Sequence, residues 1–219
     1  MTGPSSTMRS PLRTALLAVI AIGLVLLGGG LAVALGIGRT ESPTADSVDA
    51  GFSRDMALHH LQAVEMANLA LDRSEDEAVR GLAFDIAETQ KDQVGRMQGW
   101  LALWGLPPTG GDAMAWMGAG TGGHAGHTMS EGAVMPGMAT EEELAVLRGL
   151  TGQPFDVEFL RLMMRHHQGG RQMAEYAVEH AEVSAIRTLA RSIVESQAAE
   201  TGLMAGMLAD RGGTPLPAP

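Results

Sequence analysis

The chain of 219 residues contains no cysteine. This absence excludes disulfide bonds, thiolate zinc sites, cysteine-ligated iron–sulfur clusters and lipid attachment through cysteine. Aromatic residues are also scarce, at 4% of the chain, whereas Ala, Leu, Met and Glu are common. This composition favours helices over strands.

Positive charge is in short supply as well. Lys and Arg number 15 against 25 Asp and Glu, which gives a formal net charge of −10. Proteins that bind nucleic acids need basic surfaces, so this balance argues against a nucleic acid as partner. Methionine is in excess, with 15 copies, and it acts either as adaptable core packing or as a soft metal ligand.

The N-terminal region contains a long segment without charge. Residues 14–38 carry no Asp, Glu, Lys or Arg, and a helix of this length spans the roughly 30 Å core of a bilayer. Arg9 and Arg13 precede it, so the rest of the chain is expected outside the cytoplasm. We favour a single-pass anchor in the cell membrane; cleavage after Ala32-Val33-Ala34 would instead give a secreted or periplasmic protein.

The remaining chain contains an internal repeat with an offset of 107 residues. The register holds without a gap over some sixty residues, which indicates a duplicated structural unit. The principal matched positions are Phe52 and Phe159, Met56 and Met163, His59-His60 and His166-His167, Met66-Ala67 and Met173-Ala174, Gln90 and Gln197, and Met97 and Met204.

Helix-start and helix-stop signals predict that each repeat is a helical hairpin. Residues 49–72 form the first helix, and a capping box at Ser74–Glu77 opens the second. A further capping box at Thr140–Glu143 opens a short helix, Pro154 suits the start of the third long helix, and residues 184–210 form the fourth. Four such amphipathic helices bury their apolar faces most simply as an all-α four-helix bundle.

The expected organisation has five parts. They are an anchor or signal segment over residues 1–39, a tether over 40–48, hairpins over 49–106 and 140–212 that together form the bundle, a Gly/Met/His-rich linker over 107–139, and a tail over 213–219.

The histidine pairs are predicted to face the bundle interior. At 100° per residue, Met56 lies at the centre of the buried stripe of its helix, and His59 and His60 flank it. On the second helix Gln90 and Met97 face the core. Adjacent histidines diverge by about 100°, so either ions bind at separate edges or ligands from different helices converge.

Imidazole and thioether ligands together favour copper, because thioether prefers Cu(I) and imidazole accepts either oxidation state. The competing interpretation is a structural network in which buried histidines and glutamines bond to one another. The predicted metal ligands are His59, His60, His166, His167, Met56, Met66, Met97, Met163, Met173 and Met204. Gln90 and Gln197 are expected to surround these ligands without binding the ion themselves. Another transition metal is the alternative cofactor.

The linker adds a second set of candidate ligands. Its glycines predict a flexible segment in which packing does not explain the methionines. These residues are either incidental, membrane-contacting or soft ligands that wrap Cu(I). They are Met114, Met117, His124, His127, Met129, Met135 and Met138.

Residues 52–60 and 159–169, with Met-x-x-His-His in each, and Met135-Pro-Gly-Met138 resemble the exported domain-of-unknown-function family 305. The resemblance covers residues 49–212. It implies a ferritin-like four-helix fold outside the cytoplasm, and some relatives are associated with copper handling.

One departure from the family pattern is Gly169-Gly170, which matches Gln62-Ala63 in the first repeat. It is expected to loosen the helix, since each glycine costs about 1 kcal/mol, and to make the two halves unequal in affinity.

The favoured function is therefore extracytoplasmic copper binding or buffering, with a metal donor or acceptor protein as partner. A metal-dependent oxidoreductase is an alternative, but the sequence offers no nucleophile–base set and no catalytic residue. A structural bundle whose histidines sense pH is the third possibility, because imidazole titrates near pH 6.5.

Overall fold

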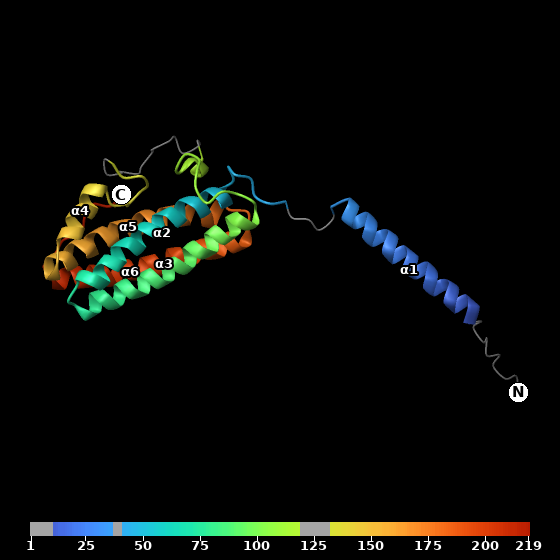
Figure 1. Cartoon of the computed structure of the whole chain (residues 1–219), viewed down its shortest axis with the longest axis horizontal. Coiled ribbons are helices and arrows are strands. Elements are labelled where there is room, and N and C mark those ends of the chain that lie inside the picture. Colours follow the sequence, from blue (N-terminus) through green and yellow to red (C-terminus); the bar gives the residue numbers. More distant parts are fainter. Residues whose placement is uncertain (1–10, 37–40, 119–131) are drawn as a thin grey trace, which may run out of the picture. The chain divides into compact units, whose positions relative to one another are not determined.

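The computed structural model describes residues 11–36, 41–118 and 132–219. Within these ranges all regular secondary structure is helical, as predicted. The helices are α1 (Pro11–Ala34), α2 (Val48–Arg73), α3 (Glu77–Leu103), the short 3-10 helix η1 (Ala115–Met117), α4 (Glu141–Gly149), α5 (Gly152–His180) and α6 (Ser184–Asp210) (Figure 1). The chain divides into two compact units, residues 1–42 and 43–219.

The first unit consists essentially of α1. Among the described residues, this is the helix that is long and apolar enough to cross a membrane, and none of it is buried. A signal sequence near an N-terminus has the same properties.

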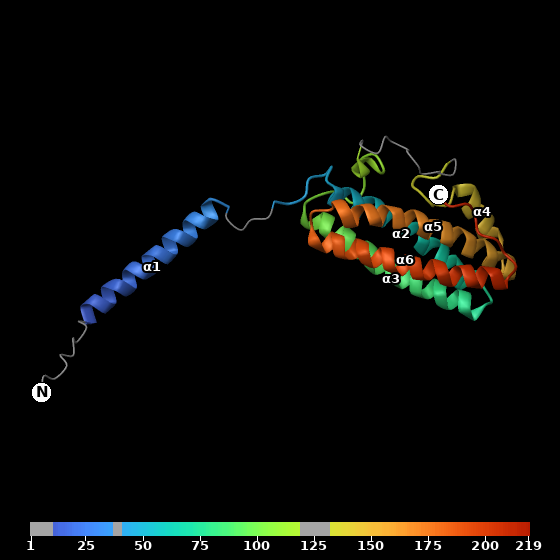
Figure 2. The ribbon, with the colours of Figure 1, turned by 180° about the vertical axis from the view of Figure 1, so that it is seen from behind.

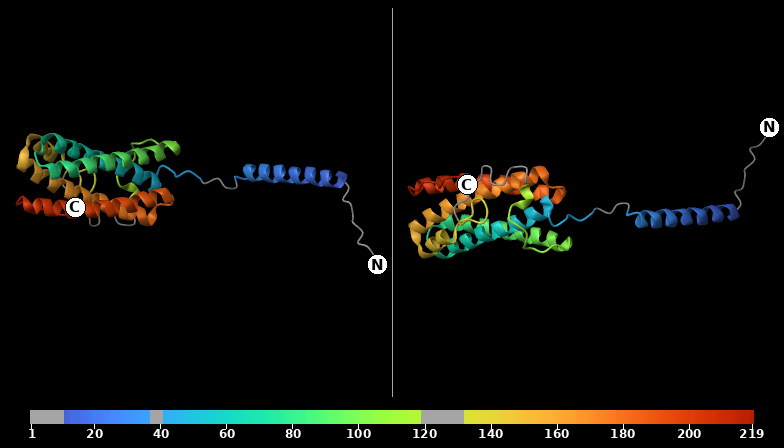
Figure 3. Two further views of the ribbon diagram at one scale, coloured as in Figure 1. Left: turned by 90° about the horizontal axis from the view of Figure 1, so that it is seen from below. Right: turned by 90° about the horizontal axis from the view of Figure 1, so that it is seen from above.

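The second unit is a bundle of two helical hairpins. α2 packs against α3, α5 packs against α6, and the hairpins join where α2 packs against α5. The views from opposite sides show α2 and α5 side by side and antiparallel (Figures 1 and 2), and the views from above and below show the two hairpins as separate pairs (Figure 3). The α2–α5 contact is therefore the place where residues of both hairpins meet.

Polar side chains fix the helix ends. The capping box at Thr140 and Glu143 is confirmed at the start of α4. The capping box predicted at Ser74–Glu77 is wrong, because Ser74 ends α2 and Asp76 caps α3 by accepting from two backbone amides. An aspartate two residues after Ser74 offers a charged acceptor to the free amides, which is stronger than a hydroxyl.

The prediction of a flexible linker is wrong for its described parts. Met135 has no exposed surface, and Met138 is 6% exposed. In η1, the Trp116 indole lies edge-on to Phe52 and donates a hydrogen bond to Asp55. Glycine content did not prevent packing, because the apolar residues between the glycines add to the core. His124, His127 and Met129 lie outside the described residues.

Candidate metal centre

The core of the bundle is divided in two along its length. One apolar cluster includes Met66 and Met163, and the other includes Met56 and Met173. The residues that separate these clusters on α2 and α5 are the two histidine pairs. On α3 and α6 the corresponding gap holds polar residues. We call this set the polar layer: His59, His60, Gln90, Gln93, His166, His167, Gln197 and Glu200.

The centre of the polar layer is a contact between the two hairpins. The rings of His59 and His166 have centroids 3.8 Å apart and planes inclined by 37°. Within each adjacent pair the rings are farther apart, 6.5 Å for His59 and His60 and 6.3 Å for His166 and His167. All four histidines are fully buried. The close pair thus forms between helices rather than between neighbours in sequence.

The two central histidines donate to backbone oxygens. His166 Nε2 donates to the carbonyl oxygen of His59 at 2.9 Å. His59 Nε2 does not return this bond but donates to the carbonyl oxygen of Pro136 at 3.0 Å. The segment between the hairpins therefore completes the layer and makes its two halves unequal.

The two outer histidines donate to side chains of the following helix. His60 Nε2 lies 2.7 Å from Oε1 of Gln93 on α3. His167 Nε2 lies 2.6 Å from Oε2 of Glu200 on α6. Each outer ring is thus held by its own hairpin.

These bonds determine which ring nitrogen is free. Carbonyl and carboxylate oxygens only accept, so each neutral imidazole carries its proton on Nε2 and its lone pair on Nδ1. All four Nδ1 atoms are buried without a hydrogen-bond partner in the described part of the chain. Burial lowers the pKa of His59 to about 4 and of His60 to about 3, and lowers the pKa of His166 well below its usual value. Near pH 7 the rings of His59, His60 and His166 are therefore neutral, and each offers the lone pair of Nδ1.

Glycine at residues 169 and 170 makes space for the layer's neighbours. A Cβ on Gly169 would lie 2.0 Å from the Pro136 carbonyl oxygen, and one on Gly170 would lie 2.9 Å from Oε1 of Gln197 and 3.1 Å from Cε1 of His59. α5 runs unbroken from Gly152 to His180. The expectation that these glycines loosen the helix is therefore wrong; backbone contacts exclude a side chain at Gly169, and a side chain at Gly170 would press on Gln197 and His59.

The segment at Pro136 is held firmly from both hairpins. Gln62 donates to the carbonyl of Ala139 at 3.0 Å and accepts from its amide at 2.7 Å. Gly137 adopts φ of 78°, and a Cβ there would lie 2.4 Å from the carbonyl oxygen of Arg165. A residue with a side chain is excluded from this position, so the Met135–Met138 turn depends on its glycine.

The two predicted glutamines are buried, but neither is bonded to a histidine of the described residues. Gln90 is 3% exposed and its Oε1 has no hydrogen-bond partner among the described residues. The same is true of both amide atoms of Gln197, which is 2% exposed. Gln93 and Glu200 were not predicted. They are 107 residues apart, so the repeat itself was the signal that could have found them.

The predicted methionine ligands lie on both sides of the layer. Met66, Met163 and Met204 belong to one apolar cluster. Met56, Met97 and Met173 belong to the other, together with Met135 and Met138. Met114 and Met117, at η1, are partly buried against that second cluster. Thioethers are thus available next to the layer from either end.

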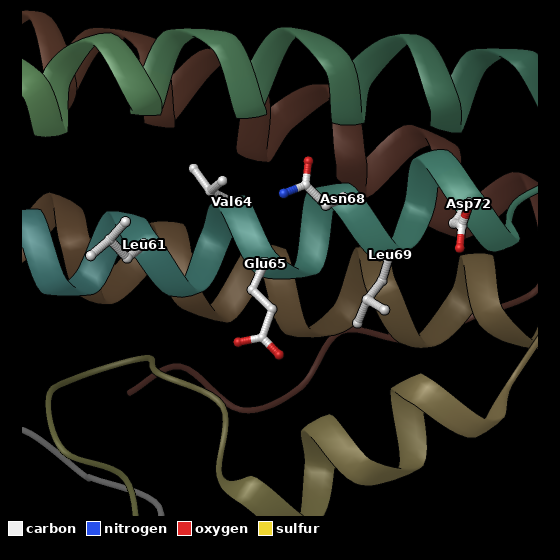
Figure 4. A pocket seen from close by; sticks show the side chains of 6 residues that line it. All are labelled: Leu61, Val64, Glu65, Asn68, Leu69 and Asp72. Atoms are coloured by element: carbon white, nitrogen blue, oxygen red, sulfur yellow. The ribbon is translucent and has the colours of Figure 1, made fainter.

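Carboxylates and imidazoles alone do not form a ready-made site. Within the described ranges, no group of three or more His, Cys, Asp or Glu side chains is placed to hold a metal ion. An open surface pocket of about 460 Å³ on α2 contains none of the predicted ligands (Figure 4); it is lined by Leu61, Val64, Glu65, Asn68, Leu69 and Asp72. The polar layer remains the place where unpartnered donor atoms collect.

An all-α bundle crossed by a layer of buried histidines, with methionines in the apolar clusters on either side, defines the class of this protein. The chain belongs to the family described as "Domain of unknown function (DUF305)", which matches residues 49–208. The resemblance indicated by the paired histidine motifs is therefore confirmed. A comparison with curated proteins found no match.

Solved structures of relatives share the fold. A DUF305 protein from Streptomyces coelicolor, described as secreted, is 47% identical, with a TM-score of 0.71 over 80% of this chain and 99% of its own. A DUF305 fragment from Deinococcus radiodurans is 34% identical, with a TM-score of 0.62 over 74% and 96%. CopM in its Cu(II)-bound form is 29% identical, with a TM-score of 0.56 over 75% of this chain and 97% of its own.

Proposed function

We propose that this chain binds copper outside the cytoplasm, through the histidines of the polar layer and the methionines beside it. The observation that carries the proposal is the set of four buried Nδ1 atoms without hydrogen-bond partners among the described residues. Leaving buried polar atoms unpaired costs about 1–3 kcal/mol each, so a network of purely structural histidines would be expected to pair them.

The Nε2 hydrogen bonds support the same proposal. Metal-bound histidines usually donate their other ring N–H to a carbonyl or carboxylate, which fixes the tautomer and the ring orientation. The acceptors here are backbone carbonyls for His59 and His166, an amide for His60 and a carboxylate for His167. Each ring thus donates through Nε2 and turns Nδ1 toward the position of a metal ligand.

Copper is favoured because the remaining ligands have to come mainly from thioethers. Soft thioether ligands prefer Cu(I), and imidazole suits both copper states. CopM, a neighbour of 25–29% identity, is known in Cu(I)-bound and Cu(II)-bound forms. With α1 as membrane anchor or export signal, the bundle would buffer copper or pass it to a partner outside the membrane.

Copper titration of the full chain, purified metal-free in detergent, tests this function. We expect stoichiometric binding of Cu(I) under anaerobic conditions and its loss when His59 and His166 are both replaced by alanine. The matched control is His180→Ala, because His180 is exposed and outside the layer. Unchanged binding by the double variant, or no binding by the natural chain, would refute the proposal.

A further inference from the structure

The outer histidines of the polar layer differ in the charge of the group behind them. His60 and His167 each bond through Nε2 to the residue 33 positions later on the next helix. In the first hairpin this residue is Gln93, a neutral amide that is buried. In the second it is Glu200, whose side chain is 22% exposed. The two acceptors are nearly equal in size, so the main chemical difference between them is the charge of the carboxylate.

The rest of the layer does nothing to cancel this difference. The central rings of His59 and His166 donate to neutral backbone carbonyls. Among the described acidic side chains, Glu200 is the one that accepts a hydrogen bond from an imidazole of the layer, namely that of His167. A cation in this layer would therefore meet one compensating negative charge, and it would meet that charge through His167.

A carboxylate behind an imidazole changes what its free nitrogen can bind. Hydrogen bonding to a carboxylate raises the basicity of the ligand ring, and loss of such a partner typically lowers metal affinity 10–100-fold. The Coulomb attraction is proportional to the charge of the ion, so a dication gains twice as much as a monocation. Burial strengthens the effect, since an uncompensated charge in an apolar core is unfavourable.

We propose that Glu200 and Gln93 are positioning residues that give the two hairpins different preferences for the oxidation state of copper. Through His167, Glu200 makes the second hairpin favour Cu(II). Through His60, Gln93 leaves the first hairpin selective for Cu(I). This inference rests on the proposed copper function of the same layer.

The test measures the Cu(II) and Cu(I) affinities of the full chain in detergent by competition with a chelator for each ion. We expect Glu200→Gln to weaken Cu(II) binding about 10–100-fold and Cu(I) binding by much less. The potential of the bound couple should then rise by about 59 mV for each tenfold change in the affinity ratio. Gln93→Glu is the matched reciprocal change, and it should strengthen Cu(II) binding.

Two further measurements separate this role from a structural one. In a His167→Ala background, Glu200→Gln should change the affinity ratio much less, because only the attraction through space remains and the hydrogen bond to the ligand ring is gone. An equal loss of both ions in Glu200→Gln, or an effect that is equally large without His167, would overturn the inference while copper binding stands. A natural chain that takes up no copper would instead refute the proposed function itself.

Discussion

Replacing Gly169 by alanine should displace the Met135–Met138 turn, which completes the polar layer. The added Cβ would lie 2.0 Å from the carbonyl oxygen of Pro136 and 2.8 Å from the amide nitrogen of Gly137. Both are backbone atoms, so a side-chain rotation cannot relieve the contact. The turn has to move away, and the hydrogen bond from His59 Nε2 to Pro136 breaks with it.

The expected loss follows from three contributions. Overpacking costs about 1–3 kcal/mol, and a buried imidazole N–H without an acceptor costs about 1–3 kcal/mol more. The better helix propensity of alanine returns at most about 1 kcal/mol. Gly169→Ala should therefore lower the free energy of unfolding by about 1–5 kcal/mol. Each kcal/mol corresponds to a fall in Tm of about 2–4 °C in a domain of this size.

Tryptophan fluorescence in urea measures this change selectively, because Trp100, Trp104 and Trp116 all belong to the bundle unit. Gly202→Ala is the matched control. It lies within α6, and nothing is within 4 Å of its added Cβ, so it should stabilise the bundle by up to about 1 kcal/mol. If Gly169→Ala matched this control, the close approach of the Pro136 segment to α5 would be incorrect.

Two other predictions concern the ends and the acid stability of the bundle. Asp55→Ala removes the acceptor for the Met114 amide and the Trp116 indole, each at 2.7 Å; it should red-shift the tryptophan emission and cost about 1–3 kcal/mol. Unaltered emission would show that η1 is held by other contacts. The stability of the metal-free bundle should be constant above about pH 6.5 and fall as the pH decreases toward 4. In that range the histidines of the unfolded chain bind protons, whereas His59 and His60 of the folded bundle stay neutral because burial lowers their pKa values. Each histidine contributes up to about 1.4 kcal/mol per pH unit, and a flat profile between pH 7 and 5 would contradict their burial.

The burial of the histidines could be predicted because it depends on helical periodicity alone. Met56 lies at the centre of the inward stripe of α2, and a residue three or four positions away stays on the same side. The same rule could have identified Gln93. It lies 60° from Gln90 on the helix, as far from the centre of the stripe as His59, which was assigned to the interior.

The closure of the layer by the Met135–Met138 turn could not be predicted from the sequence. Its glycines are locally equivalent to those of a flexible linker. Its order comes from tertiary contacts, namely the reciprocal bonds of Ala139 with Gln62 and the fit of Gly137 against Gly169. The partners in these contacts are separated by many residues in the sequence, so the composition of the linker does not predict the contacts.

The most direct test of a copper site in the polar layer is anomalous diffraction at the copper edge from crystals of the copper-loaded chain. We predict a copper peak among His59, His60, His166 and His167, at bonding distance from at least one Nδ1 atom. Copper found only outside the bundle core, with all four Nδ1 atoms still unligated, would contradict the account.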